Sequence, residues 1–479
     1  MKRHTTTSGT IAALAALVFM VSACTASSDN KTTPSSGGGL GKDRTTTSVA
    51  PSASSWGTLS NLCKAGSAKV DTTQNHGGAE LNLGTATDKS STIIPGLLAE
   101  MWDASRSFVK WCNDQGGIQG LKINLIDLDA ALLQPKPAIN QACDRVFAMV
   151  GGGITFDDQE FPEFHKCKMV DIAGFTVTSA KAMSNGYVQP IPNPSNDKPA
   201  TWFKDIAQLR PSDIAKPVIV HGDFQTTVTV AQQYKEQLSK IKGYGTPDMI
   251  SYSSVSVASW VPFAQKIKDG GYTWFTFVGT PQQQAQLLKA MDQIGSRPHT
   301  IVLEANHYDQ SIIDIGGKSA EGIIVRTPKH AFQEADRWPA IKKMLDQENA
   351  KVTNPHIGDL GIQTTSAWLL FVTAANTCLA ANHGVLEREC LLKAAAGTTN
   401  WDGGGLHAPT HPNTNLPPTC NMFLTVKNGV WVRLYPKIGS ADDTKDGFHC
   451  LDDGVQHLTG DYGKGVIDPS RPILFANEH

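Results

Sequence analysis

Several residues in this sequence have types and spacings that could support catalysis, but none of them completes a motif. Gly316-Gly317-Lys318-Ser319 is similar to the end of a phosphate-binding loop, yet Ile312 stands where that loop needs a glycine. His407 and His411 have the spacing of two zinc ligands on one helix, but Pro409 lies between them and would interrupt a helix. We therefore expect neither a phosphate-binding loop nor a metal site.

Two further enzyme signatures are missing from the sequence. It contains no G-x-S-x-G nucleophile elbow, which counts against an α/β-hydrolase. No G-x-G-x-x-G follows the first predicted strand, which counts against a nicotinamide cofactor. The nearest enzyme hypothesis would use Asp157 or Asp158 with a neighbouring hydroxyl as acid and base, but the spacing does not require this pairing. We expect a protein that is not an enzyme and binds no cofactor.

The composition narrows the class of protein further. The 479 residues include 42 basic and 44 acidic side chains, with a formal net charge of −2, whereas nucleic-acid surfaces need a basic excess. The hydrophobic share of 40% is enough for a folded core. After residue 23, no stretch provides the roughly 18 uninterrupted apolar residues of a membrane span. We expect a folded body of two domains that does not bind nucleic acid.

The N-terminus has the features of an export signal. Basic residues precede an apolar run over residues 11–20, and Val21-Ser22-Ala23-Cys24 resembles a bacterial lipobox, whose cysteine receives a lipid. The alternative is an ordinary secretory signal followed by an incidental cysteine. We expect a lipoprotein signal peptide over residues 1–23, then a lipidated Cys24 and a flexible tether rich in Ser, Thr, Gly and Pro over residues 24–60. This places the protein outside the cytoplasm, anchored to the membrane by the lipid on Cys24.

The remaining eight cysteines form an even set, which in an exported protein predicts up to four disulfides. The sequence alone does not choose among the possible pairings. Closeness along the chain favours Cys378–Cys390 and Cys143–Cys167, which leaves Cys420–Cys450 and Cys63–Cys112. A zinc site is disfavoured because no C-x-x-C pair occurs.

Short β-rich runs alternate with helical patterns twice along the chain, on either side of a proline-rich segment around residues 190–199. In the first series, a helix opened by Pro95 and stopped by Gly116-Gly117 follows the strand at residues 81–84. Lys427-Asn428-Gly429 between two β-rich runs predicts a hairpin. Such alternation is typical of α/β folds with doubly wound parallel sheets. The other strands are expected at residues 123–126, 147–151, 169–172, 218–220, 249–252, 274–278, 301–303 and 322–326.

The segment Asn113-Asp114-Gln115-Gly116-Gly117-Ile118-Gln119-Gly120, followed by Leu121, Lys122 and a strand, resembles the first βαβ unit of type I solute-binding proteins of branched-chain amino acid ABC importers. The resemblance covers about residues 79–435. It implies two α/β lobes that are joined by three crossovers and close on a ligand. The implied boundaries are residues 61–192 with 326–415 for the first lobe, 193–325 with 416–436 for the second, and 437–479 for a C-terminal tail held by a disulfide.

The ligand is expected outside the carboxyl ends of the parallel strands, where loop amides and helix N-termini meet. In the amino-acid-binding relatives, hydroxyls of the first lobe hold the carboxylate and an acid of the second lobe holds the ammonium. The resemblance therefore implies Thr155, Thr176 and Thr178 for the carboxylate and Glu304 for the ammonium. Further candidates in the same loops are Gly153, Phe175, Asp223 and Thr280.

Each of these residues also has an ordinary structural interpretation. Thr178 is a suitable helix N-cap, the glycines at 151–153 suit a tight turn, and Glu304 suits a solvated loop. The resemblance implies a receptor that captures a small polar ligand, an amino acid or related compound, for an ABC permease and ATPase. The alternatives are a ligand sensor of the same fold that does not take part in transport, or a membrane-tethered enzyme.

Overall fold

The computed structural model describes residues 53–478. The expected signal peptide, Cys24 and most of the expected tether lie outside this range. Residues 53–60 lie inside it and belong to the folded body, because Trp56 is only 1% exposed and packs against Phe108 and Trp111. The body therefore begins before residue 61, although the composition of this segment resembles that of a linker.

The first of the two main sheets has five strands, all parallel, and its strand order reverses at the earliest of its own strands along the chain. Its central strands are short and fully buried, as expected for a parallel sheet covered on both faces. The order is β3 (Ile123–Asp129), β2 (Leu81–Thr87), β4 (Ala148–Val150), β5 (Asp171–Ile172) and β6 (Tyr187–Val188).

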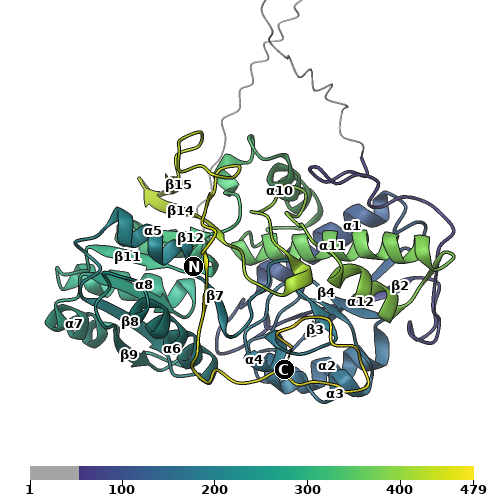
Figure 1. The fold of residues 1–479 in the computed structure, drawn as a ribbon, viewed down its shortest axis with the longest axis horizontal. Helices are drawn as coiled ribbons and strands as arrows, with labels where there is room; N and C mark the ends of the chain where they lie inside the picture. The colour runs from purple at the N-terminus through teal and green to yellow at the C-terminus, as the bar shows by residue number, and fades with distance from the viewer. Residues whose placement is uncertain (1–52, 479) are drawn as a thin grey trace, which may run out of the picture. The chain divides into compact units, whose positions relative to one another are not determined.

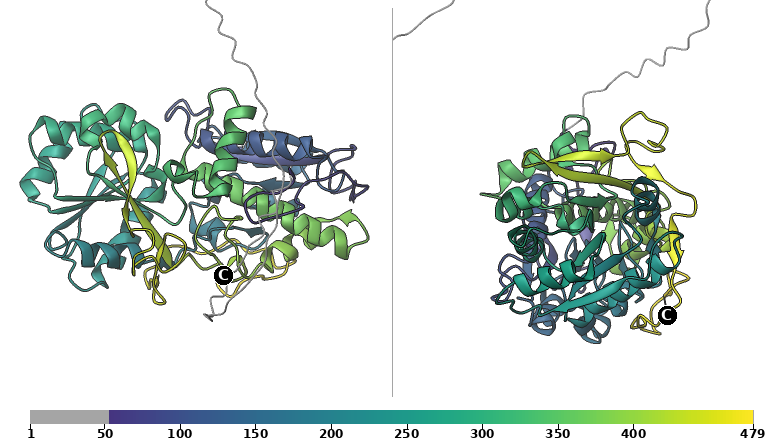
Figure 2. Two further views of the ribbon diagram at one scale, coloured as in Figure 1. Left: turned by 90° about the horizontal axis from the view of Figure 1, so that it is seen from above. Right: turned by 90° about the vertical axis from the view of Figure 1, so that its left-hand side faces the viewer.

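The second main sheet has eight strands, and its parallel part continues into an antiparallel hairpin (Figure 2). The predicted Asn-Gly turn joins the two hairpin strands, β14 and β15. The order is β15 (Val430–Tyr435), β14 (Cys420–Lys427), β12 (Ile324–Thr327), β11 (Thr300–Leu303), β10 (Trp274–Val278), β8 (Pro217–Gly222) and β9 (Asp248–Tyr252), and β16 (His449–Cys450) also pairs with β14.

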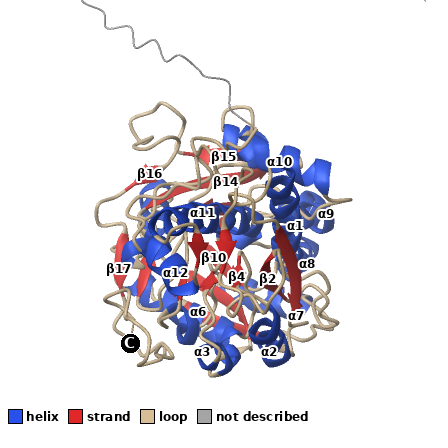
Figure 3. Ribbon diagram, turned by 90° about the vertical axis from the view of Figure 1, so that its right-hand side faces the viewer, coloured by secondary structure: helices blue, strands red, loops and turns tan. Residues whose placement is uncertain are grey.

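Helices surround the sheets (Figure 3), and successive residues along a strand pack in apolar clusters on opposite faces. Along β8, Val218 and Val220 pack in one apolar cluster, whereas Ile219 packs in the cluster on the other face. The helices are α1 (Ala99–Asp114), α2 (Pro135–Arg145), α3 (Glu163–Lys166), α4 (Ser179–Ala182), α5 (Thr201–Leu209), α6 (Gln225–Ser239), α7 (Val261–Gly270), α8 (Pro281–Gln293), α9 (Gln310–Gly316), α10 (Pro339–Lys351), α11 (Asp359–Ala381) and α12 (Arg388–Ala396).

The chain passes between the two sheets three times: after β6, after β12, and before β14. Between the second and third passages it forms α10, α11 and α12, which pack with the first sheet (Figure 1). This arrangement confirms the predicted α/β class, with one parallel and one mixed sheet joined by three crossovers.

Helix α1 begins four residues later than Pro95, where the sequence pattern placed its start. Gly96 and Leu98 have φ angles of 78° and 62°, so the chain turns before the helix forms. The end of the helix agrees with the prediction, because Gly116 and Gly117 have positive φ and pack tightly. A side chain at Gly117 would come within 2.2 Å of the carbonyl oxygen of Leu121.

Helix α11 is long and apolar enough to cross a bilayer, but most of its side chains are buried inside the protein. Trp368 and Phe371 belong to the same apolar cluster as Leu81 and Leu83 of β2. The helix is therefore a core helix of the first sheet. Its even hydrophobicity reflects burial on nearly all sides.

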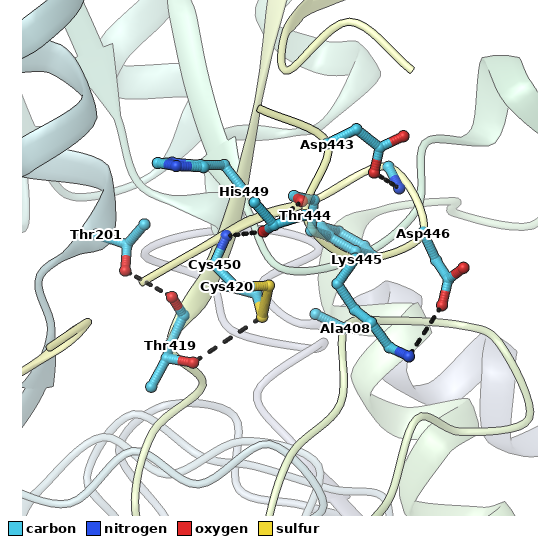
Figure 4. The surroundings of a disulfide bond; sticks show 12 residues. Thr201, Ala408, Thr419, Cys420, Asp443, Thr444, Lys445, Asp446, His449 and Cys450 are labelled. Atoms are coloured by element: carbon cyan, nitrogen blue, oxygen red, sulfur yellow. Dashed lines mark hydrogen bonds and ion pairs between the residues drawn. A yellow bond between two sulfur atoms is a disulfide. The ribbon is translucent and has the colours of Figure 1, made fainter. Parts of the chain in front are cut away.

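All eight cysteines in the described range form disulfides, in the pairs that proximity along the chain favoured: Cys63–Cys112, Cys143–Cys167, Cys378–Cys390 and Cys420–Cys450. The last of these attaches the C-terminal tail to β14. Next to it, the Thr201 hydroxyl donates a hydrogen bond of 2.5 Å to the carbonyl oxygen of Thr419 (Figure 4).

The tail beyond Cys450 contacts both parts of the molecule. Its strand β17 (Val455–His457) pairs with β7 (Asp197–Pro199), which lies in the first passage. The backbone amides of Thr459 and Gly460 donate to Glu236 of α6. Farther along, Lys168 beside the first sheet pairs with Asp468 at 2.5 Å. The tail, which is yellow in Figure 1, therefore forms a strap from the second sheet to the first.

One further short strand pair lies outside the two main sheets and joins β1 (Lys69–Val70) to β13 (Val385–Leu386).

Candidate functional site

A cleft of about 480 Å³ lies between the two sheets and is lined from both sides. This volume is in the range of small-molecule sites. Its walls come from the loops that follow β4, β5, β8, β10 and β11, from the start of α1, and from all three passages between the sheets. The lining residues used below are Leu97, Glu100, Thr155, Phe175, Lys198, Trp202, Phe224, Tyr234, Phe277, Thr280, Glu304, His307, Asp309, Arg326, Lys329 and Asp359.

The most densely bonded carboxylate in the cleft is that of Glu304, directly after β11. It forms an ion pair with Arg326 of β12, accepts a 2.6 Å hydrogen bond from the Tyr234 hydroxyl and accepts the backbone N–H of Ala305. Burial alone would raise the pKa of Glu304, but the guanidinium and these donors hold it below its ordinary value. Glu304 is therefore an ionised group whose charge Arg326 already balances.

Arg326 is held in place on two sides. Its guanidinium lies over the Trp202 ring, 5.4 Å from the ring centroid, in addition to pairing with Glu304. Its buried Nε has no hydrogen-bond partner within residues 53–478. This unpaired donor is covered by protein, so it does not face the open space of the cleft.

Lys198, in the first passage, is a buried cation of the cleft with few partners. The residue is 9% exposed, and its Nζ donates a 2.9 Å hydrogen bond to Asn193 Oδ1. Burial lowers its pKa to about 8. Within the described part of the chain, no carboxylate oxygen lies within 4.0 Å of Nζ, so this ammonium lacks a counter-charge in direct contact.

Two other groups of charges line the cleft. Lys329 forms an ion pair with Asp359, which also accepts a 2.9 Å hydrogen bond from the Thr327 hydroxyl. Burial, together with the carboxylates of Asp309 and Asp359, raises the pKa of Glu100 to about 8. The first group is neutral as a pair, and Glu100 is mostly protonated at neutral pH.

His307 adds a neutral imidazole to the cleft. Burial lowers its pKa to about 4, and neither ring nitrogen has a hydrogen-bond partner within residues 53–478. A neutral imidazole offers one donor and one acceptor. Both nitrogens are themselves buried, so neither is open to a ligand in the cleft of this structure.

Four of the residues predicted from the sequence line this cleft: Thr155, Phe175, Thr280 and Glu304. Thr155 follows β4, and its backbone amide donates to Asp88 at 2.7 Å. Thr280 caps α8, where its hydroxyl accepts the Gln283 amide. Their roles in binding stay predictions.

The other four predicted residues are not part of the cleft lining. Thr176 is fully buried and donates to Gln189 at 3.0 Å, and Thr178 caps α4 and donates to Asp157 at 2.5 Å. Asp223 is exposed and accepts the Ser254 amide. A side chain at Gly153 would come within 2.9 Å of Phe175. These residues shape the loops around the cleft rather than its surface.

The alternatives set aside on sequence grounds can also be located. Asp157 is buried and accepts two backbone amides as well as the Thr178 hydroxyl, so it organises a loop outside the cleft lining. His407 contacts Ser366, whereas His411 contacts the carbonyl of Thr399. No group of three or more metal-ligating side chains gathers anywhere in residues 53–478.

Sequence reasoning missed Arg326 and Lys198 as site residues. Arg326 lies in an expected strand and Lys198 in the proline-rich segment between the two series, and neither segment was expected to contribute to the site. The available signal was a single basic residue inside an otherwise apolar or proline-rich passage between lobes, where a charge is costly unless it has a partner.

Comparison with known proteins defines the class. The sequence model of the periplasmic binding protein family matches residues 80–430, and the chain belongs to this family. The Leu/Ile/Val-binding protein of Escherichia coli (strain K12) is 23% identical over 252 residues, which is 51% of this chain and 65% of that protein.

Solved structures with the same fold include a fatty acid ABC transporter substrate-binding protein from Thermomonospora curvata, with a TM-score of 0.63 and 16% identity. That likeness covers 78% of this chain and 94% of the other. A leucine-binding protein from Thermotoga maritima MSB8 has a TM-score of 0.60 and 14% identity, over 74% and 98% of the two chains. At these identities, the likeness shows the fold.

Proposed function

We propose that this protein is an extracytoplasmic receptor that captures a small solute by closing two lobes and presents it to an ABC permease and ATPase. The observation that carries the proposal is a cleft between two sheets, lined from both, with ionic groups inside it. A ligand that contacts both walls stabilises the closed arrangement over an open one. Family membership supports the same function.

The lobes of this proposal are residues 61–192 with 326–415, extended by residues 53–60 because Trp56 packs there, and residues 193–325 with 416–436. The two kinds of solute named for the structural relatives, a fatty acid and leucine, are both carboxylic acids with an apolar chain. A carboxylate-bearing compound, an amino acid or a relative of one, is the expected ligand. Lipid attachment at Cys24 would hold the receptor at the membrane.

The test is capture and release of an unchanged solute. Native mass spectrometry of the purified protein should show a bound small molecule that leaves intact, and small-angle scattering should show compaction when it is added back. Recovery of a chemically converted molecule would contradict the proposal and favour a tethered enzyme. Loss of solute uptake on deletion of the gene would favour a role in transport over a role in sensing.

A second experiment tests the anchor. Cys24→Ala should move the protein from the membrane fraction to the soluble fraction, because the thiol that would carry the lipid is gone. A variant that stays with the membrane would show that Cys24 is not the attachment point.

A further inference from the structure

The groups in the cleft identify the class of solute more narrowly, and this step rests on the proposed function. Glu304 stands where an acid would bind the ammonium of an amino acid. Its carboxylate is already bonded to Arg326, Tyr234 and the Ala305 amide. An ammonium at this position would have to displace Arg326.

Displacing Arg326 is unfavourable because its side chain is largely buried over Trp202. A buried cation that loses its carboxylate stays behind as an uncompensated charge, which costs more than the new pair gains. Glu304 is therefore poorly suited to bind an ammonium group. Asp359 is likewise already paired, with Lys329, and is poorly suited to bind an ammonium group.

Two charged side chains of the cleft have no ion-pair partner within residues 53–478: the Asp309 carboxylate and, more deeply buried, the Lys198 ammonium. Nζ of this residue contacts Asn193, has no carboxylate within 4.0 Å in the described chain, and is nearly fully buried. A buried ammonium with unused donors is a binding site for an anionic oxygen.

The rest of the cleft suits an apolar body. Phe224 lines it from the second sheet, and Leu97 and Phe175 line it from the first. Trp202 and Phe277 lie behind this surface and are almost fully buried. Burial of apolar ligand surface against such side chains supplies most of the binding energy of small molecules.

We propose that the solute is an apolar carboxylic acid without an α-ammonium group, with its carboxylate at Lys198 and its apolar body between the aromatic side chains. Asp309 is the acidic group that could still receive an ammonium, since its carboxylate accepts the Ser311 amide and forms no ion pair within residues 53–478. Binding of amino acids through Asp309 is the competing outcome.

The experiment compares acids that differ only by the α-ammonium, with calorimetric titration of the purified protein. The pairs are 4-methylpentanoic acid with leucine, and 3-phenylpropanoic acid with phenylalanine. The acids should bind at least about tenfold more tightly, as expected when a buried charge is matched by one ligand and opposed by the other. Equal or tighter binding of the amino acids would overturn the assignment, as would binding of neither class.

Substitutions of Lys198 test whether its ammonium group binds the carboxylate of the solute. Lys198→Gln should weaken binding of the acids by about tenfold or more, whereas Lys198→Arg should keep most of the affinity. Lys342→Gln, at an exposed pair with Asp346, should change nothing. Unchanged affinity in a Lys198→Gln protein with a wild-type circular dichroism spectrum would overturn the role of Lys198.

Different results would contradict the ligand assignment and the receptor function. If another class of solute is found bound and compacts the protein, the ligand assignment is wrong and the receptor function stands. If the bound molecule is converted, or if no solute compacts the protein, the receptor function itself fails.

Discussion

Phe156, from the loop after β4, lies edge-on to Phe224, which precedes α6 on the other side of the cleft. Their ring centroids are 5.3 Å apart, with an interplanar angle of 68°. This contact joins loops that belong to different sheets. It is therefore an interaction that exists only when the two parts of the protein are close together.

Removing the Phe156 ring should favour the open arrangement. An edge-to-face pair contributes about 0.5–1.5 kcal/mol, so Phe156→Ala should weaken ligand binding by roughly two- to tenfold. Phe156 is outside the cleft lining, so a direct contact with the ligand is not lost. Titration calorimetry and small-angle scattering measure the two effects. Phe156→Leu, which keeps apolar contact, should lie in between, and unchanged affinity in both variants would show that the contact does not govern closure.

The pair of Arg326 and Glu304 leads to a prediction about specificity. Arg326→Met removes the cation and leaves the Glu304 carboxylate available to an ammonium group. Amino acids should then gain affinity relative to the matching deamino acids. Titration of leucine against 4-methylpentanoic acid measures this exchange, and a preference identical to that of the wild type would contradict it.

The same substitution has a cost in stability. An unpaired buried carboxylate destabilises a protein by about 3–5 kcal/mol, with less expected here because the Glu304 side chain is 25% exposed. Arg326→Met combined with Glu304→Gln should recover much of the loss, because the double variant leaves no lone charge. Urea unfolding of the single and double variants checks this.

Glu100 predicts a dependence of stability on pH. Its pKa is about 8 in the folded protein, mainly because of burial, and near its ordinary value of 4.5 when unfolded. Between these values the folded state holds a proton that the unfolded state has lost, so stability falls as pH rises, by at most about 1.4 kcal/mol per pH unit. Glu100→Gln should lose less stability than the wild type between pH 5 and pH 8.

Chemical unfolding at several pH values measures this difference. The exposed Glu80→Gln variant serves as the control, and it should follow the wild-type dependence. Parallel curves for Glu100→Gln and the wild type would show that Glu100 is ionised in both states.

The Cys420–Cys450 disulfide predicts the behaviour of the tail. Replacing both cysteines with serine removes a link across 30 residues, which is expected to cost about 2–4 kcal/mol. The tail should become more accessible to proteases, with cleavage beyond residue 436 detected by mass spectrometry. Cleavage at the wild-type rate would mean that strand pairing and polar contacts alone hold the tail.

Much of the fold could be predicted from the sequence. Strands such as Trp274–Val278 are short apolar runs between clear turn signals, and the Asn428-Gly429 turn specifies its hairpin locally. The start of α1 could not be predicted, because the backbone of Leu98 adopts a conformation that its residue type disfavours. Trp56 was assigned to the tether for a related reason, since its burial depends on Phe108 and Trp111, far away in the sequence.

The candidate site was predictable only in part. Thr155, Thr280 and Glu304 follow strands whose carboxyl ends face the cleft, and position along a strand can be read from the sequence. The ionic state of Glu304 cannot be predicted from the sequence, because it is set by Arg326 on the neighbouring strand. Lys198 shows the same limit, since its lack of a carboxylate partner is a property of the assembled cleft.

The strap formed by the tail restricts the direction in which the two lobes can move apart. Tyr462 receives a hydrogen bond from Ser179 beside the first sheet, while its hydroxyl donates to Glu236 on the second at 2.5 Å. A rotation that parts the two bodies along this side must break such bonds, whereas a rotation about this side as an axis leaves them intact. The cleft of the proposed receptor should therefore open on the side away from its C-terminal tail.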